Sequence, residues 1–155
     1  MKKIDDIDLR ILTLLYNDAD INNKDLAAKI GIAPSTCLER VKRLKSSGII
    51  KGSFIEVNLK SIGGNIEAIA AIRLQPYSEE IVNKLRDDLL QLPEIISLYH
   101  MGGNYDYYIH MLVSDSEHLR QFVFQEITSR DEVQTVETSL VFEHSRSSVL
   151  PQFDD

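Results

Sequence analysis

The spacing of apolar residues changes once along this chain, and that change limits the folds available to it. Up to Gly48 apolar residues recur every three or four positions, which is the period of an amphipathic helix. From Ile66 onward, short apolar runs alternate with helix-like segments. The 155 residues correspond to about one domain, or to two small modules. We therefore expect an α+β chain with a helical first module and a mixed second module.

Three helices are expected in the first module. The first lies near residues 5–17, with Asp5 as its N-cap. The second follows Asn22 and ends at Gly31, and Pro34 suits the first turn of the third. Two short helices joined by a turn of about three residues form a helix-turn-helix, whose second helix enters the major groove of DNA. A purely structural three-helix unit explains the same pattern.

The charge of the chain is divided between the modules. Residues 1–60 carry 11 Lys or Arg and 8 Asp or Glu, a net charge of +3, whereas residues 61–155 carry 6 and 16, a net charge of -10, and the two sum to -7. The cations around the third helix favour a surface that faces DNA phosphates, although a solvated helix face is the simpler explanation. Ser and Thr can bind bases or phosphates, and Arg can contact guanine with two hydrogen bonds. The candidate DNA-contacting residues are Ser35, Thr36, Glu39, Arg40, Lys42, Arg43, Lys45 and Lys51.

Residues 49–58 connect the modules and are rich in β-branched and aromatic side chains around Gly52. This composition predicts a short β-strand or wing. The following residues 62–65, Ile-Gly-Gly-Asn, form a flexible joint.

The second module has the element order β-α-β-β-α-β. This order is typical of the ferredoxin-like fold, in which two helices cover one face of an antiparallel sheet. The expected strands are residues 66–74, 95–101, 105–113 and 133–142, and the expected helices begin at Ser78 and within residues 114–116.

The opposite face of this sheet is also predicted to be apolar. Ile69 and Ala71 of the first strand point to it, as do Tyr108 and Leu112 of the third. An apolar face needs a cover, and the chain has no further helix to provide one. A second copy of the sheet is therefore expected to cover it, giving a two-fold homodimer. Two recognition helices would then read half-sites about one helical turn apart, or a multiple of that distance.

The turn between the two middle strands is a candidate ligand site. Residues 100–108 read HMGGNYDYY, and the two glycines favour a nest of backbone N–H groups that binds an anion. Such a nest could hold an α-carboxylate while Asp106 binds an ammonium group. A hairpin in which Asp106 only caps the turn explains the same residues.

These segments resemble a known family. IDDIDLRILTLLYNDADINNKDLAAKIGIAPSTCLERVKRLKSSGIIKG is similar to the DNA-binding domain of the leucine-responsive/AsnC transcriptional regulators, and GGNYDYYI resembles their G-x-x-D-Y turn. The resemblance implies a winged helix-turn-helix (residues 1–52), a β-strand linker (53–65) and a ferredoxin-like domain for effector binding and oligomerisation (66–155).

The same resemblance implies partners. It implies double-stranded DNA, homodimers that assemble into tetramers or octamers, and an amino-acid effector bound where the effector domains of neighbouring dimers meet. Ala33 departs from the family, in which many members have a Ser cap. The effector contacts that the resemblance implies are Met101, Gly102, Gly103, Asn104, Tyr105, Asp106, Thr138, Ser139 and Leu140.

Other classes of protein are disfavoured. The longest stretch without Asp, Glu, Lys or Arg is residues 95–105, which is too short for a membrane helix, so we expect a cytoplasmic protein. Cys37 is the only cysteine, and the four histidines lack metal-ligand spacing. No nucleophile–base pair is apparent, so no enzymatic activity, metal or cofactor is expected.

The sequence thus predicts a sequence-specific DNA-binding transcriptional regulator whose assembly or DNA affinity responds to a small molecule. A ligand-independent protein that wraps DNA is the alternative. An RNA-binding module is disfavoured by the acidic second module. The tail after His144 is expected either to pack across a dimer or to stay mobile.

Overall fold

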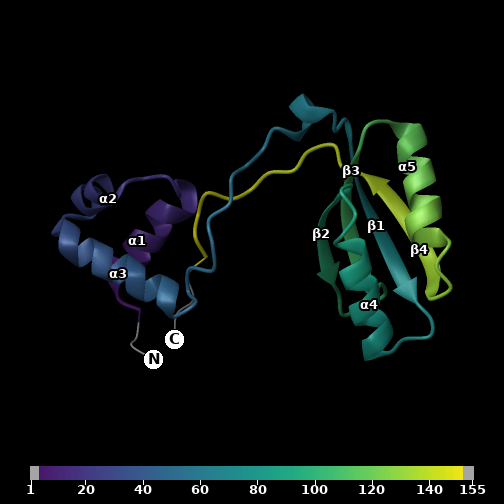
Figure 1. Cartoon of the computed structure of the whole chain (residues 1–155), viewed down its shortest axis with the longest axis horizontal. Helices are drawn as coiled ribbons and strands as arrows, with labels where there is room; N and C mark the ends of the chain where they lie inside the picture. The colour runs from purple at the N-terminus through teal and green to yellow at the C-terminus, as the bar shows by residue number, and fades with distance from the viewer. Residues whose placement is uncertain (1–3, 152–155) are drawn as a thin grey trace. The chain divides into compact units, whose positions relative to one another are not determined.

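The computed structural model describes residues 4–151 and divides into two compact units. The described residues up to Glu56 and from Ser145 onward form the N-terminal unit, and Val57–His144 form the C-terminal unit. Figure 1 labels the elements of each. The tail from Ser145 therefore groups with the N-terminal unit, whereas the expected boundaries placed it in the second domain.

The N-terminal unit contains the three helices predicted from the sequence. Their starts follow from local chemistry. The side chain of Asp5 caps the first helix, the side chain of Asn22 caps the second, and Pro34 begins the third. Gly31 ends the second helix with φ 83°, in the left-handed region that glycine adopts without strain. The helices are α1 (Asp6–Asn17), α2 (Asn23–Ile30) and α3 (Pro34–Ser46).

One small core holds these helices together. Ile11 of α1, Leu26 of α2 and Leu44 of α3 are fully or nearly fully buried, and Cys37 fills the space beside them. Cys37 thus acts as a small apolar residue, and burial raises the pKa of its thiol. Among the described residues, Asp8 is the only buried charged side chain.

The predicted strand over residues 49–58 is absent. The segment from Lys51 to Asn58 has no regular secondary structure, and Phe54 and Ile55 are 90% and 83% exposed. A β-strand needs a neighbour that accepts and donates its backbone hydrogen bonds, and the described part of this one chain supplies none to the segment. A short 3-10 helix, η1 (Leu59–Ile62), follows and leads into the sheet.

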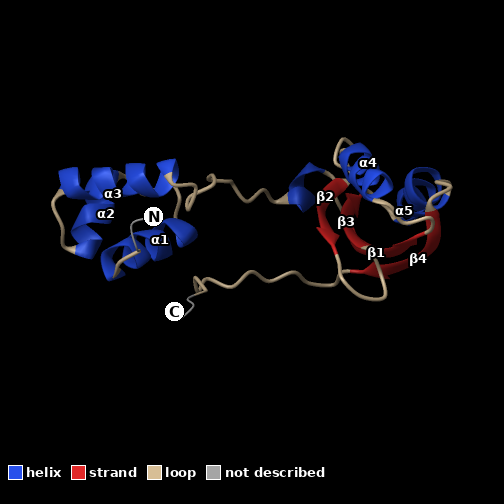
Figure 2. Cartoon of the chain, turned by 90° about the horizontal axis from the view of Figure 1, so that it is seen from below, coloured by secondary structure: helices blue, strands red, loops and turns tan. Residues whose placement is uncertain are grey.

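The C-terminal unit has the predicted ferredoxin-like order. Its sheet is antiparallel with strand order β2-β3-β1-β4, and both helices lie on the same side of it (Figure 2). The fold class, α+β with a helix-turn-helix before a βαββαβ domain, is confirmed. The elements are β1 (Ile66–Leu74), α4 (Glu79–Leu89), β2 (Ile95–His100), β3 (Tyr107–Val113), α5 (Ser116–Phe122), its π-helical continuation η2 (Val123–Thr128) and β4 (Val133–Leu140).

The core of this unit lies between the helices and the sheet. β3 alternates between buried and half-buried side chains, as a strand with one face on a core does. Ala70 of β1 is paired with Ile109 of β3, and both are fully buried, as is Leu89 of α4. The register therefore places the predicted apolar set of each central strand toward the helices.

The sheet face away from the helices is mixed rather than apolar. Ile69, Tyr108 and Leu112 lie on it half-buried, as expected. However, the ring of His110 also lies there, and its Nε2 atom is 2.5 Å from Oε1 of Glu67. The alternation of side chains requires these two polar residues to share a face with the apolar ones. The predicted apolar residues thus lie on this face, but the polar pair beside them was not predicted, because only the apolar positions were considered.

Candidate nucleic-acid interface and effector site

The short turn after Gly31 places α3 against α2 as in a helix-turn-helix. The side-chain amide of Asn23 at the start of α2 donates to the backbone carbonyl of Pro34 at 2.8 Å, which joins the first turns of the two helices. No side chain caps α3, because its N-cap is Ala33. Ser35 and Thr36 in its first turn are exposed.

The predicted DNA-contacting residues separate into two groups. Arg40 and Arg43 are half-buried and form ion pairs with acidic residues of α1 and its cap. The other six side chains are exposed and available to a ligand: Ser35, Thr36, Glu39, Lys42, Lys45 and Lys51.

The two arginines converge on two carboxylates. Nη1 of Arg40 lies 2.7 Å from both oxygens of Asp5 and 2.8 Å from Oδ1 of Asp8. Nη2 of Arg43 donates to Oδ2 of Asp8. The hydrogen bond from Arg40 lowers the pKa of Asp5 to about 2, and the carboxylates of Asp5 and Asp8 raise the pKa of Arg40. The Asp5 carboxylate and the Arg40 guanidinium are thus held in their charged forms.

Asp5 and Asp8 were not among the candidate functional residues, although the sequence contained a signal for them. Asp5 and Asp8 have the spacing of a capping box, and the structure shows both of its hydrogen bonds. Arg40 and Arg43 are also three residues apart, which places their side chains on one side of a helix. What the sequence did not show is that these two pairs face each other.

The turn at Met101–Asp106 joins β2 to β3, and its residues from Met101 to Asn104 are exposed. Asp106 fixes this turn to the end of β1. Its backbone N–H donates to the carbonyl of Ile72 at 2.8 Å, and its carboxylate accepts from the N–H of Leu74 at 2.7 Å. Asp106 therefore has a structural role, because its carboxylate joins the turn to β1.

Aromatic side chains border this turn, and the sequence reasoning did not identify them as a group. The hydroxyl of Tyr77 lies 3.2 Å from Nε2 of His100, whose ring stacks on Tyr107 with centroids 4.9 Å apart. On the other side, a hydrogen bond to the Glu137 carboxylate raises the pKa of Tyr105. The turn thus has polar aromatic groups on both sides.

In the second predicted effector segment, Thr138 and Leu140 line a cavity that includes no residue of this turn. These residues of β4 pair with residues 68–70 of β1, whereas the turn is bonded to Ile72 and Leu74. Ser139 also points to the other face of the sheet from its two neighbours.

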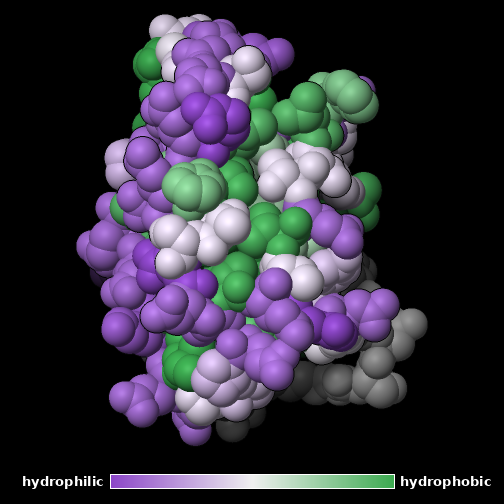
Figure 3. Space-filling view, turned by 90° about the vertical axis from the view of Figure 1, so that its right-hand side faces the viewer, coloured by the Kyte–Doolittle hydropathy of each residue, from purple (hydrophilic) through white to green (hydrophobic). Residues whose placement is uncertain are grey.

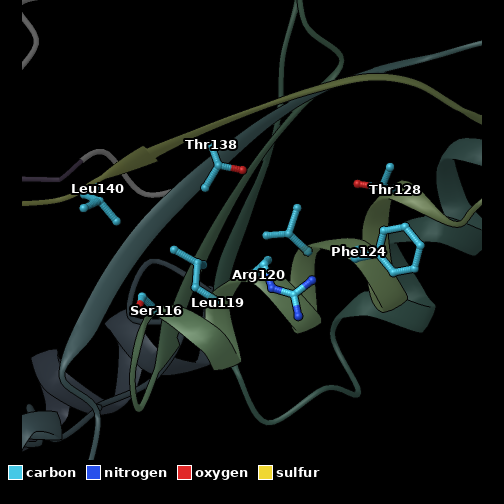
Figure 4. A pocket seen from close by; sticks show the side chains of 8 residues that line it. Ser116, Leu119, Arg120, Phe124, Thr128, Thr138 and Leu140 are labelled. Atoms are coloured by element: carbon cyan, nitrogen blue, oxygen red, sulfur yellow. The ribbon is translucent and has the colours of Figure 1, made fainter.

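Thr138 and Leu140 instead line a separate cavity beside α5 and η2. The cavity has a volume of 360 Å³ and is mainly apolar (Figure 4). Figure 3 views the molecule from the side on which α5 and β4 lie in Figure 1, and it shows hydrophobic side chains among hydrophilic ones. The other lining residues are Ser116, Leu119, Arg120, Val123, Phe124 and Thr128.

Within residues 4–151, no three His, Cys, Asp or Glu side chains are grouped in a way that could hold a metal ion. None of the helices in this part of the chain combines the length and the apolar character that crossing a bilayer requires.

Comparison with known proteins agrees with this architecture. Residues 4–51 match the winged helix-turn-helix DNA-binding model, and residues 67–149 match the Lrp/AsnC ligand binding domain. The transcriptional regulator AldR of Mycolicibacterium smegmatis is 35% identical over 147 residues, which span 95% of this chain and 86% of AldR. The regulator AzlB of Bacillus subtilis is 32% identical over 152 residues, 98% of this chain and 97% of AzlB.

The fold is also that of solved regulators. The crystal structure of a transcriptional regulator from Neisseria meningitidis in complex with L-Met superposes with a TM-score of 0.88. The superposition covers 96% of this chain and 97% of the Neisseria chain. The sequence identity is 23%, so this likeness concerns the fold alone. From its matching domains and its similarity to AldR and AzlB, the chain belongs to the Lrp/AsnC family of transcriptional regulators, which are not enzymes.

Proposed function

We propose that this regulator binds double-stranded DNA in a sequence-specific manner through the exposed side of α3. The observation that carries the proposal is the exposure of polar and basic side chains along this helix, with Ser35 and Thr36 at its start and Lys42 and Lys45 further along. N-terminal residues of a recognition helix reach base edges, while lysines neutralise phosphates.

Selection from a randomised duplex pool tests this proposal. The wild-type chain is expected to enrich a defined sequence, with an affinity that falls steeply as salt rises, because phosphate contacts release counterions. Lys45→Gln is expected to reduce the salt dependence by about one released ion. Recovery of no preferred sequence would disprove sequence-specific binding.

We further propose that the protein works as a homodimer. On the sheet face away from α4 and α5, Ile69 and Leu112 are only half-buried, and Phe54 and Ile55 of the connecting segment are exposed to solvent. A second copy would cover the face and give the segment a strand partner. Analytical ultracentrifugation at micromolar concentration is expected to give at least twice the chain mass of 17.6 kDa. A 17.6 kDa species would refute the dimer, and a larger assembly would indicate tetramers or octamers.

The effector that we propose is an α-amino acid at the turn Met101–Asp106, completed by Thr138–Leu140 of a neighbouring copy. Two observations support it: the turn is exposed from Met101 to Asn104, and the cavity that Thr138 and Leu140 line in the same chain contains no residue of the turn. The L-Met complex of the Neisseria regulator supports the class of ligand.

A thermal-shift screen of the common amino acids tests the effector. A ligand present at about 100 times its Kd stabilises the folded protein by about 2.7 kcal/mol, so the melting temperature is expected to rise with one or a few amino acids. If none raises it, the ligand-independent DNA-wrapping protein becomes the better description.

A further inference from the structure

Four charged residues of the N-terminal unit form one closed set of contacts, here called the Asp8 clamp: Asp5, Asp8, Arg40 and Arg43. At its centre is the Asp8 carboxylate, which is 1% exposed. One of its oxygens accepts from Arg40 at 2.8 Å, and the other accepts from Arg43 and from the backbone N–H of Asp5 at 3.3 Å.

We propose that Asp8 is a positioning residue for the DNA-reading helix. In this assignment, Arg40 and Arg43 set the orientation of α3 on α1 and do not contact bases. The inference rests on the proposed DNA binding by α3, and it changes which side chains of that helix carry sequence specificity.

Burial makes this arrangement persist when DNA is bound. A buried carboxylate that loses its partners retains the full cost of its desolvation. If either arginine turned toward a base, it would leave an oxygen of Asp8 without its guanidinium partner, away from water. Both guanidinium groups are themselves partly shielded, with side chains 20% and 34% exposed. The contact with Asp8 is therefore the stable one for each arginine.

The helical period supports the same division. Ser35, Glu39 and Lys42 are separated by four and three residues, so they lie on one side of α3, and all three are exposed. Arg40 and Arg43 are also one turn apart, but their side of the helix is turned toward the acids of α1. Base readout is thereby assigned to Ser35, Glu39 and Lys42.

A double-mutant cycle on the full-length protein tests the inference. Its probe is a duplex that the wild type selects from a randomised pool, compared with a scrambled duplex of equal length. The variants are Asp8→Asn, Arg43→Gln and both together. Asp6→Asn is the matched control, because it removes one charge from the same turn of α1 without touching the clamp.

Within the clamp, the losses of affinity are expected to overlap. Asp8→Asn and Arg43→Gln should each weaken binding to the selected duplex by about tenfold, while the double variant should lose little more than one of them, because residues in one network are not additive. The control should stay within about twofold of the wild type. In Asp8→Asn and Arg43→Gln, the preference for the selected base should weaken at all positions of the duplex together. In Lys42→Gln, it should weaken at only one or two neighbouring base pairs.

The inference would be overturned if the double variant lost affinity by the product of the two single losses. It would also be overturned by a selected sequence that changes at a single base pair in Arg43→Gln but not in Asp8→Asn, because that is the behaviour of a base-reading arginine. Helical circular dichroism checks that each variant folds. If Asp8→Asn does not fold, the cycle is run with Asp5→Asn and Arg40→Gln, since Asp5 is half-exposed. Failure of the wild type to select any duplex would disprove the proposed function itself, and the positioning role with it.

Discussion

The carboxylate of Asp106 accepts a hydrogen bond from the backbone N–H of Leu74 at 2.7 Å, which ties the β2–β3 turn to the end of β1. The contact occurs where β1 changes its register with β4, between Arg73 and Leu74. At such an irregularity a backbone N–H lies outside the regular ladder, and the carboxylate provides its acceptor. Asp106 thus contributes to the sheet as well as to the proposed effector site.

Asp106→Asn and Asp106→Ala are expected to separate these two roles. The Asn side chain keeps an oxygen that can accept from Leu74, so it should change stability little, whereas Ala leaves that N–H unsatisfied and should cost about 1–3 kcal/mol. If the carboxylate also binds the ammonium group of an amino acid, Asn should abolish the ligand-induced rise in melting temperature. Chemical denaturation and thermal shift of both variants provide the measurement. An unchanged ligand response in Asp106→Asn would remove Asp106 from the effector site.

The contact between Asp5 and Arg40 predicts a loss of stability at acid pH. The pKa of Asp5 is lowered from 3.8 to about 2 in the folded protein, so the folded state favours its ionised form. The contribution is therefore present above pH 3.8 and is lost as the pH falls through about 2. Urea midpoints measured between pH 5 and pH 2 should fall less steeply for Asp5→Asn than for the wild type. Equal slopes would contradict the pairing.

Truncation of a central core residue should destabilise the C-terminal unit strongly. Ile109 on β3 is fully buried between the sheet and the helices, so Ile109→Ala is expected to cost about 2–5 kcal/mol through lost apolar contacts and the cavity that remains. Ile96→Ala on β2 is the matched control, because that side chain is 41% exposed and should cost much less. Urea denaturation followed by circular dichroism compares the two. Similar losses at both positions would mean that Ile109 is not in the core.

Gly31 should resist substitution because of its backbone and not because of crowding. Its φ is 83°, and an added Cβ would meet nothing within 4 Å. Gly31→Ala is therefore expected to destabilise the N-terminal unit by about 1–2 kcal/mol, which is the cost of a left-handed conformation for an L-residue. Gly102→Ala is the control, since it also has open space but no positive φ. Comparable melting temperatures for the two variants would argue against a conformational origin.

The C-terminal tail should be released by loss of Arg146. Its guanidinium lies 4.2 Å from the centroid of the Tyr16 ring and donates to the carbonyl of Tyr16 at 3.0 Å, while Asn17 donates to the carbonyl of Ser148 at 3.0 Å. Arg146→Ala removes a cation–π contact that typically contributes about 0.5–1 kcal/mol at an exposed site, so proteases should cut the tail faster. Arg146→Lys keeps the charge, so proteases should cut the tail of this variant at a rate between those of the wild type and Arg146→Ala. Identical rates for all three proteins would mean that these contacts do not hold the tail.

Many helix boundaries and the buried face of β3 could be predicted from single residues and their spacing. The caps at Asp5 and Asn22, the left-handed glycine at Gly31 and the proline at Pro34 each depend on a few neighbouring residues, so helix boundaries followed from local chemistry. The alternation of β3 likewise predicted its buried face. The strand over residues 49–58 was not predictable in this way, because a strand exists only with a partner, and the described chain offers none to that segment.

In the candidate site, too, features that depend on neighbouring residues were predicted, whereas contacts between residues far apart in the sequence were not. Sequence alone determined that α3 carries polar and basic residues at helical spacing, and that a glycine turn precedes Asp106. Only the tertiary structure decided that Arg40 and Arg43 are bound to acids some 35 positions earlier, and that Asp106 is bound to β1. The physical reason is that exposure and pairing of a charged side chain depend on which elements pack against it, and periodicity along one helix or strand carries no record of its neighbours.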